Sequence, residues 1–97
     1  MDISQKQIEF NKRCLYCMQE MRAINLIPSM KSLVLEAGLS YTRYTEMDRV
    51  FRQGRGNMRY KTIEFDLINL MVEKYGVSAD WLITGRGSMF YTAINNK

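Results

Sequence analysis

The sequence predicts an all-α domain of about five helices, and two observations lead to that prediction. Apolar residues recur at intervals of three and four over most of the chain, which places them on one face of a helix. Glycines stand where these apolar stripes end, and no convincing β-strand alternation interrupts them. A chain of 97 residues can form one helical core without disulfides. We therefore expect a single domain over residues 1–97.

The first helix is predicted over residues 4–25. Its inward stripe recurs at i, i+4, i+7, i+11 and i+14 and consists of Phe10, Cys14, Cys17, Met21 and Ile24. Ile8 and Leu15 form a minor second stripe, which could cover the core or meet another subunit. Pro28 ends this segment, because proline lacks a backbone N–H and restricts the residue before it.

Residues 29–53 predict a helix, a tight turn and a second helix. Ser29 is expected to cap the helix at 30–37, and Ser40 the helix at 41–52. Gly38 stands where the chain needs a positive φ to leave the first of them. The apolar residues of this stretch can all face inward only if the two helices cross; they are Leu33, Ala37, Leu39, Tyr44 and Met47.

Two more helices are expected after a basic, glycine-containing loop at residues 53–57. Thr62 is the expected N-cap of the fourth helix, whose inward stripe consists of Ile63, Leu67, Leu70 and Met71. Gly76 ends it, Ser78 caps a short fifth helix, and Gly85 ends that one. The tail over residues 88–97 could pack back on the core or meet a partner.

The stretch from Met30 onward resembles the helix-turn-helix of the lambda-repressor/Cro-like family. Counted from Met30, the family has apolar residues in places four, eight, ten, fifteen and eighteen and glycine in place nine, and all six match here: Leu33, Ala37, Leu39, Tyr44, Met47 and Gly38. The chain departs from the family at Met30, where glutamine is usual, and at Val34, where a small residue is usual.

Two later segments extend the resemblance. Gly54 and Arg55 are similar to the glycine-basic pair that closes the family's recognition helix, and residues 75–85 resemble the end of the domain in phage-repressor-type bacterial regulators. The resemblance covers about residues 12–90. It implies a lambda-repressor-like domain in which residues 1–11 are an N-terminal helical extension.

The outward face of the third helix is polar and carries groups that suit the major groove of DNA. Arginine can donate two hydrogen bonds to guanine, glutamate can accept from cytosine, and a threonine methyl can contact thymine. The family reads bases with the matching positions, which here are Tyr41, Thr42, Thr45, Glu46 and Arg49. The predicted DNA-backbone contacts are Ser29, Lys31, Ser40, Arg43, Arg52, Arg55, Asn57, Arg59 and Lys61. For Tyr41 the alternative is a partly buried surface aromatic.

The net charge of +4 is concentrated in one segment. Residues 43–61 contain six basic and two acidic residues, whereas the rest of the chain has eight of each. A basic patch on one element is typical of a protein that binds a polyanion. The alternative is a solvated basic face with no partner.

Other chemistry is disfavoured. The chain has no histidine, no glycine-rich phosphate loop after a strand, and only scattered carboxylates, so we expect no enzyme activity, cofactor or small-molecule substrate. Cys14 and Cys17 form a CxxC in mid-helix on the core stripe, which favours two structural thiols and no metal site. An intersubunit metal, a disulfide or a redox role are the alternatives.

The functional hypothesis is a transcriptional regulator of phage or mobile-element repressor type that binds specific double-stranded DNA as a homodimer. We favour the N-terminal helix over the C-terminal tail as the dimer interface. The alternatives are a helical adaptor or antitoxin-like interaction module and, less favoured, an RNA binder. The N-terminus has no signal-peptide h-region, and no apolar run is long enough to span a membrane, so a cytoplasmic location is expected.

Overall fold

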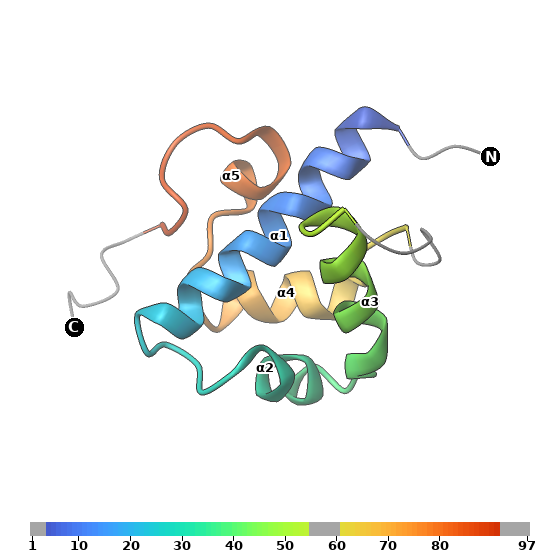
Figure 1. Ribbon diagram of the computed structural model, residues 1–97. Coiled ribbons are helices and arrows are strands. Elements are labelled where there is room, and N and C mark those ends of the chain that lie inside the picture. The colour runs from blue at the N-terminus through green and yellow to red at the C-terminus, as the bar shows by residue number, and fades with distance from the viewer. Residues whose placement is uncertain (1–3, 55–60, 92–97) are drawn as a thin grey trace.

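The computed structural model describes residues 4–54 and 61–91, and within these ranges the chain forms five helices and no strand (Figure 1). The prediction of an all-α domain is confirmed. The helices are α1 (Gln5–Ala23), α2 (Met30–Glu36), α3 (Tyr41–Phe51), α4 (Phe65–Glu73) and α5 (Ala79–Thr84).

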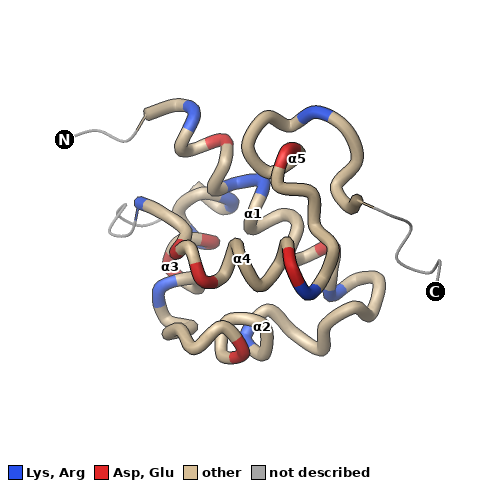
Figure 2. Tube along the Cα trace, turned by 180° about the vertical axis from the view of Figure 1, so that it is seen from behind, with Lys and Arg blue, Asp and Glu red and all other residues tan. Residues whose placement is uncertain are grey.

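The long helix α1 runs through the middle of the molecule, and the other helices surround it. In Figure 1 it crosses in front of α4, with α5 above, α2 below and α3 to the right, and α4 is in front when the molecule is seen from behind (Figure 2). α1 contacts α2, α3 and α5. Five of its hydrophobic side chains are wholly buried: Cys14, Leu15, Cys17, Met18 and Met21.

Of the two predicted alternatives for Leu15, covering the core holds, because its side chain has no exposed surface and is not available to another subunit. One prediction for α1 was wrong. Ile24 lies outside the core and is 45% exposed, because the helix ends at Ala23 and Asn25 adopts a φ of 63° directly afterwards. Phe10 is half-buried against the core, as is Ile8.

The α2–α3 pair is joined by residues 37–40. Gly38 has a φ of 80°, as predicted for the end of α2, and Ser29 Oγ accepts a hydrogen bond of 3.0 Å from Ser32 N at its start. Ser40 holds the N-cap position of α3, but its side chain makes no capping hydrogen bond, so that part of the prediction was wrong. The predicted apolar set faces inward: Leu33, Tyr44 and Met47 are buried, and Ala37 and Leu39 are half-buried.

The fourth helix begins three residues after the predicted cap. Glu64 occupies the N-cap position of α4, whereas Thr62 lies in the preceding segment and accepts a hydrogen bond from Arg43. The fifth helix starts as predicted, with Ser78 Oγ accepting from Trp81 N at 3.1 Å, and it ends at Gly85 with a φ of 78°.

The described part of the C-terminal tail packs back on its own domain. Met89 and Phe90 lie against the core, and Phe90 forms an isolated antiparallel bridge with Val77. The backbone N–H of Ser78 donates to the carbonyl of Met89 at 2.7 Å, and that of Tyr91 donates to Gly76 at 2.9 Å. Of the two predicted alternatives for the tail, packing on the core therefore holds for Met89 and Phe90.

Both cysteines are free thiols without exposed surface. Burial raises the pKa of Cys17 to about 12, with a smaller contribution from Glu20, and it also raises the pKa of Cys14. Because the thiolate is the form that binds metals and attacks disulfides, both sulfurs behave as core atoms. Across residues 4–54 and 61–91, no helix combines the length and apolar character that crossing a bilayer requires.

Candidate nucleic-acid interface

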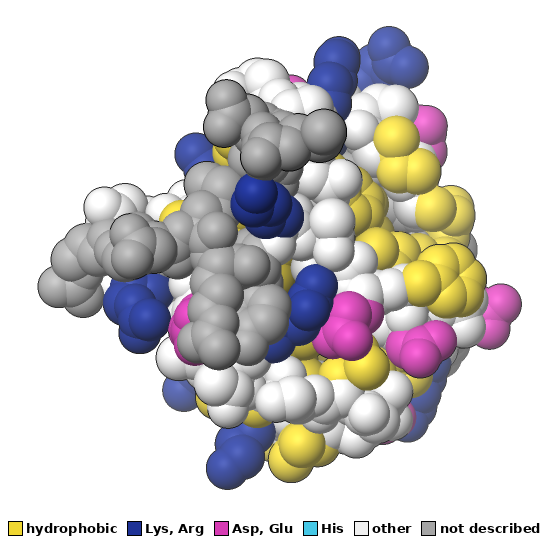
Figure 3. Space-filling model, turned by 90° about the vertical axis from the view of Figure 1, so that its right-hand side faces the viewer, with side chains coloured by type: hydrophobic (Ala, Val, Ile, Leu, Met, Phe, Trp, Pro, Cys, Tyr) yellow, Lys and Arg dark blue, Asp and Glu magenta, His cyan; other side chains and the backbone are white. Residues whose placement is uncertain are grey.

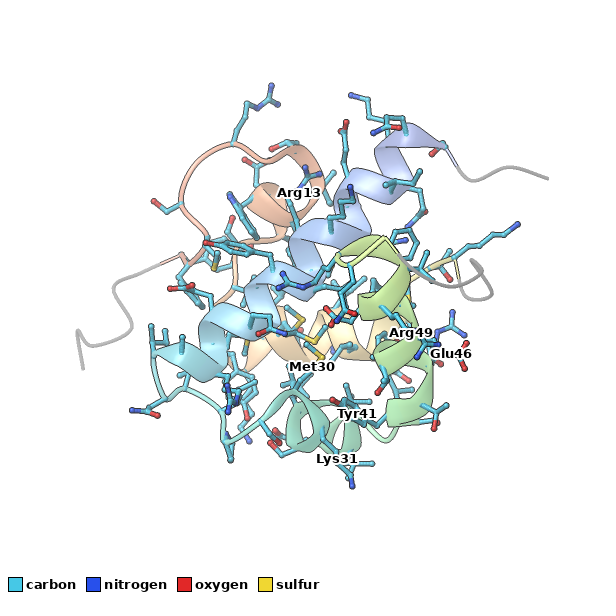
Figure 4. All side chains as sticks on the ribbon, in the orientation of Figure 1. Arg13, Met30, Lys31, Tyr41, Glu46 and Arg49 are labelled. Atoms are coloured by element: carbon cyan, nitrogen blue, oxygen red, sulfur yellow. The ribbon has the colours of Figure 1, made fainter. Side chains whose placement is uncertain are left out.

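The helix α3 divides into a buried side and a solvent side. Tyr44, Met47 and Phe51 face the core, with exposed fractions between 0 and 6%. On the other side Thr42, Thr45 and Arg49 are exposed, and Glu46 is half-buried. Figure 4 shows Glu46 and Arg49 on the outer side of the helix. Four of the five predicted base-reading residues therefore share one outward face.

Tyr41, the fifth predicted reader, has an intermediate position. Its side chain is half-buried and packs against the core cluster at the start of α3. Its ring lies next to α2 in Figure 4. The structure thus matches the alternative of a partly buried surface aromatic. Tyr41 nevertheless lies on the same side of α3 as Thr45, since both line one pocket.

Two arginines predicted as phosphate contacts are engaged within the protein. Arg43 Nη2 donates to the carbonyl oxygen of Thr62 at 2.8 Å and to Thr62 Oγ1 at 3.1 Å, and its Nε lies 3.7 Å from Glu64 Oε1. Arg52 Nε lies 2.8 Å from Asp48 Oδ1 one helical turn earlier. The sequence pattern could not reveal the first set of contacts because their partners are about twenty residues away.

The remaining predicted backbone contacts differ in their surroundings. Lys31, Ser40 and Lys61 are exposed, and Ser29 uses its hydroxyl as the cap of α2. The predictions for Arg55, Asn57 and Arg59 fall outside the described residues.

Residues 61–64 are hydrogen-bonded to side chains of α1 and α3. The buried side chain of Asn11 on α1 donates from Nδ2 to the carbonyl oxygen of Lys61 at 2.7 Å. On α3, Arg43 donates hydrogen bonds to Thr62, as described above, and the hydroxyl of Tyr44 donates one to the Glu64 carboxylate. Burial of Tyr44 raises its pKa to about 12, so the hydroxyl stays protonated and keeps its donor role. These hydrogen bonds hold the segment that precedes α4 against both α1 and α3.

Folding also brings together a pocket that no single sequence segment predicted. It has a volume of about 250 Å³ and lies between the end of α1 and the starts of α2 and α3. Its walls consist of Gln19, Arg22, Ser29, Met30, Lys31, Tyr41, Thr45 and Asp48. Sequence reasoning missed Gln19 and Arg22, because their place beside α3 depends on how α1 crosses the other helices.

A second hollow is apolar. It has a volume of about 380 Å³ and is lined by Phe10, Phe65, Ile68, Asn69, Val72, Ala79, Leu82 and Ile83, from α1, α4 and α5. Phe65 and Ile83 are 72% and 65% exposed. In Figure 3 hydrophobic side chains gather on the right-hand part of the surface, with acidic side chains beside them.

Comparison with known protein families, with curated proteins and with solved structures finds no match to this chain. The resemblance to the lambda-repressor/Cro-like family therefore stays a prediction that rests on the sequence patterns around residues 30–55 and 75–85.

Proposed function

We propose that this protein binds double-stranded DNA by inserting the outward face of α3 into the major groove, and that it regulates transcription in the manner of a phage-type repressor. The observation that carries this proposal is the exposed row of Thr42, Thr45 and Arg49 on a helix whose opposite side is firmly held in the core. A major groove about 12 Å wide admits one α-helix, so such a face can reach the base edges.

The chemistry of that face suits base reading. Arg49 makes no hydrogen bond or ion pair with another described residue in the absence of DNA, so its guanidinium is available to guanine O6 and N7. The methyl groups of Thr42 and Thr45 offer apolar contacts to thymine. Glu46 can accept a hydrogen bond from cytosine N4.

Electrostatic attraction is also consistent with a nucleic-acid partner, although the basic segment is partly neutralised. Asp48 offsets Arg52, and Glu64 lies near Arg43, so these two arginines contribute less than their number suggests. Because the Asp48 side chain is only 20% exposed, Arg52 cannot leave it for a phosphate without a cost, and we count Arg52 less than the freely exposed Arg49.

We further propose that the protein acts as a homodimer. Because Leu15 is buried, we place the second copy on the apolar hollow between α1, α4 and α5 in place of the N-terminal interface favoured from the sequence. The hollow has a protruding ring, Phe65, beside a depression lined by Ile68 and Val72, and a twofold interface requires both features on the same surface. Phe65 and Ile83 expose apolar area on the order of 200 Å² per copy. This is a fraction of the roughly 800 Å² of a stable interface, which favours a dimer completed on DNA.

The same hollow is the observation that favours the alternative function, a helical interaction module that binds another protein. The two functions differ in the surface they use. A DNA-binding protein depends on α3, whereas an interaction module depends on Phe65 and Ile83.

Selection of bound sequences from random duplex DNA, followed by binding titrations at several salt concentrations, tests the proposed function. We expect an enriched site, preferably with twofold symmetry, and an affinity that falls steeply with salt; about five neutralised phosphates give a log–log slope near −4 to −5. Failure to enrich any sequence, together with no binding to duplex DNA at low ionic strength, would contradict the proposal.

A further inference from the structure

The pocket between the end of α1 and the starts of α2 and α3 is positioned beside the proposed reading face. Tyr41 and Thr45 belong to both, since they line the pocket and lie on the solvent side of α3. A duplex that contacts α3 through Thr45 therefore passes over the mouth of this pocket. Whatever occupies the pocket must be part of the nucleic acid or compete with it.

The rim of the pocket carries two cations from different helices. Arg22 belongs to the last turn of α1 and Lys31 to the first turn of α2, and both side chains are exposed. Neither makes a hydrogen bond or an ion pair with another described residue. Asp48 is the acidic residue of the pocket wall, and its carboxylate lies 2.8 Å from Arg52. The pocket therefore favours an anion.

Met30 is the most buried residue of the pocket wall. It is only 8% exposed, and the half-buried Tyr41 lines the same pocket. Met30 occupies the position where the resembling family has a glutamine, and a thioether cannot donate a hydrogen bond. The donors that remain for an anion are the cations at the rim, the amide of Gln19 and the hydroxyl groups of the wall, among them that of Tyr41.

We propose that this pocket binds one phosphodiester group of the DNA strand that borders the major groove. Arg22 donates to two oxygens of the phosphate, because the planar guanidinium suits bidentate contacts, and Lys31 supplies a second positive charge. Arg22 thereby fixes the register of α3 from a different helix. The inference deepens the proposed function and depends on it.

Arg22→Gln and Arg86→Gln form a matched pair for the test. Both arginines are exposed, and both changes remove one positive charge, but Arg86 follows α5 and lies outside the pocket. With a duplex containing the selected site, Arg22→Gln should weaken binding about tenfold and make the salt slope shallower by about one unit. Arg86→Gln should leave both quantities near the wild-type values, and thermal melts should show that both variants are folded.

Neutral methylphosphonate groups, introduced one at a time into the same duplex, locate the phosphate. We expect one position at which the substitution weakens binding of the wild-type protein but has little further effect on Arg22→Gln. Equal effects on both proteins at every position, or equal affinities of the two variants, would overturn the phosphate site while leaving DNA binding by α3 intact. Absence of wild-type DNA binding would overturn both proposals.

Inorganic phosphate distinguishes a DNA phosphate from a free anion. Because an isolated phosphate does not gain the contacts that α3 makes with the bases, we expect no saturable binding by NMR titration at concentrations up to about ten millimolar. Saturable binding that disappears in Arg22→Gln, with unchanged DNA affinity, would identify a free-anion site and contradict the proposal.

Discussion

The hydroxyl of Tyr44 both donates to and accepts from a single residue, Glu64. It donates to the Glu64 carboxylate at 2.9 Å and accepts from the Glu64 backbone N–H at 3.0 Å. Tyr44 has no exposed surface and lies on the core side of α3, whereas Glu64 occupies the N-cap position of α4. The pair therefore sets the start of α4 against the helix whose other side is the proposed reading face.

Replacing Tyr44 by phenylalanine tests this connection. The variant keeps the ring in the core but leaves the Glu64 N–H and carboxylate without their hydroxyl partner, so we expect a loss of ~1–3 kcal/mol in the free energy of unfolding. Urea denaturation measures the loss. Tyr16→Phe is the matched control, because Tyr16 is 49% exposed and the same change there should fall within ~0.5 kcal/mol of wild type. Equal effects of the two changes would contradict the assigned role.

The same hydroxyl predicts a pH dependence in the alkaline range. Burial raises the pKa of Tyr44 from its ordinary value of 10.0 to about 12 in the folded protein, so the folded state holds this proton more tightly than the unfolded state. Its contribution to stability is complete below pH 10 and is lost as the pH rises toward 12. The stability difference between wild type and Tyr44→Phe should therefore shrink over that interval. Urea unfolding at pH 8, 10 and 11 measures it, and a constant difference would contradict the prediction.

Arg13 makes a comparable connection between α1 and the end of α5. Its Nε donates to the carbonyl oxygen of Leu82 at 2.7 Å and its Nη2 to that of Ile83 at 2.8 Å (Figure 4). These carbonyls are among those that a helix leaves unpaired at its C-terminus. Arg13→Ala should lower the free energy of unfolding by ~1–3 kcal/mol, whereas the exposed Arg86→Ala should have little effect. Urea denaturation measures the two free energies of unfolding, and equal stability of the two variants would contradict this role of Arg13.

The fold was largely predictable because its determinants are local. Gly38 and Gly85 adopt the positive φ values that their positions at helix ends required, and Ser29 and Ser78 form the expected caps. The start of α4 was not predictable from the same rules. Thr62 is a reasonable N-cap by residue type, but Arg43 on α3 takes its hydroxyl and carbonyl. A contact between distant segments therefore prevailed over a local preference.

The candidate interface was predictable only in part, for the same reason. The helical period of α3 was sufficient to separate Thr45 and Arg49 from Tyr44 and Met47. It gave no information on Arg22, which reaches the pocket only through the crossing of α1 over its neighbours. Nor could it show that Leu15 is fully buried or that Phe65 is exposed, since both depend on which faces the other helices cover.

Replacing Arg49 and Arg55 should have different effects on DNA binding, because we assign Arg49 to a base contact and Arg55 to a phosphate contact. Arg49→Ala should weaken binding at the selected site by ~1–3 kcal/mol and relax the preference at one base position, because a bidentate contact to guanine is lost. Arg55→Ala should weaken binding to all sequences about equally and make the salt slope shallower by about one unit. Fluorescence anisotropy with the selected duplex and with random duplexes measures both effects. If the two variants lose affinity in parallel on both kinds of DNA, the proposed orientation of α3 is wrong.

Phe65 provides the test of the proposed dimer. Its side chain is 72% exposed in the described structure, so Phe65→Gln should barely change the stability of the monomer. In a twofold dimer each ring is buried by the other copy, and both copies lose that contact when the residue is changed. The variant should therefore weaken assembly on a palindromic duplex at least tenfold, as measured by sedimentation equilibrium with and without DNA. Leu35→Gln is the matched control, because Leu35 is 54% exposed but does not line the hollow. Unchanged assembly of Phe65→Gln would exclude this surface as the interface, and a wild-type protein that stays monomeric on a two-half-site duplex would exclude the dimer.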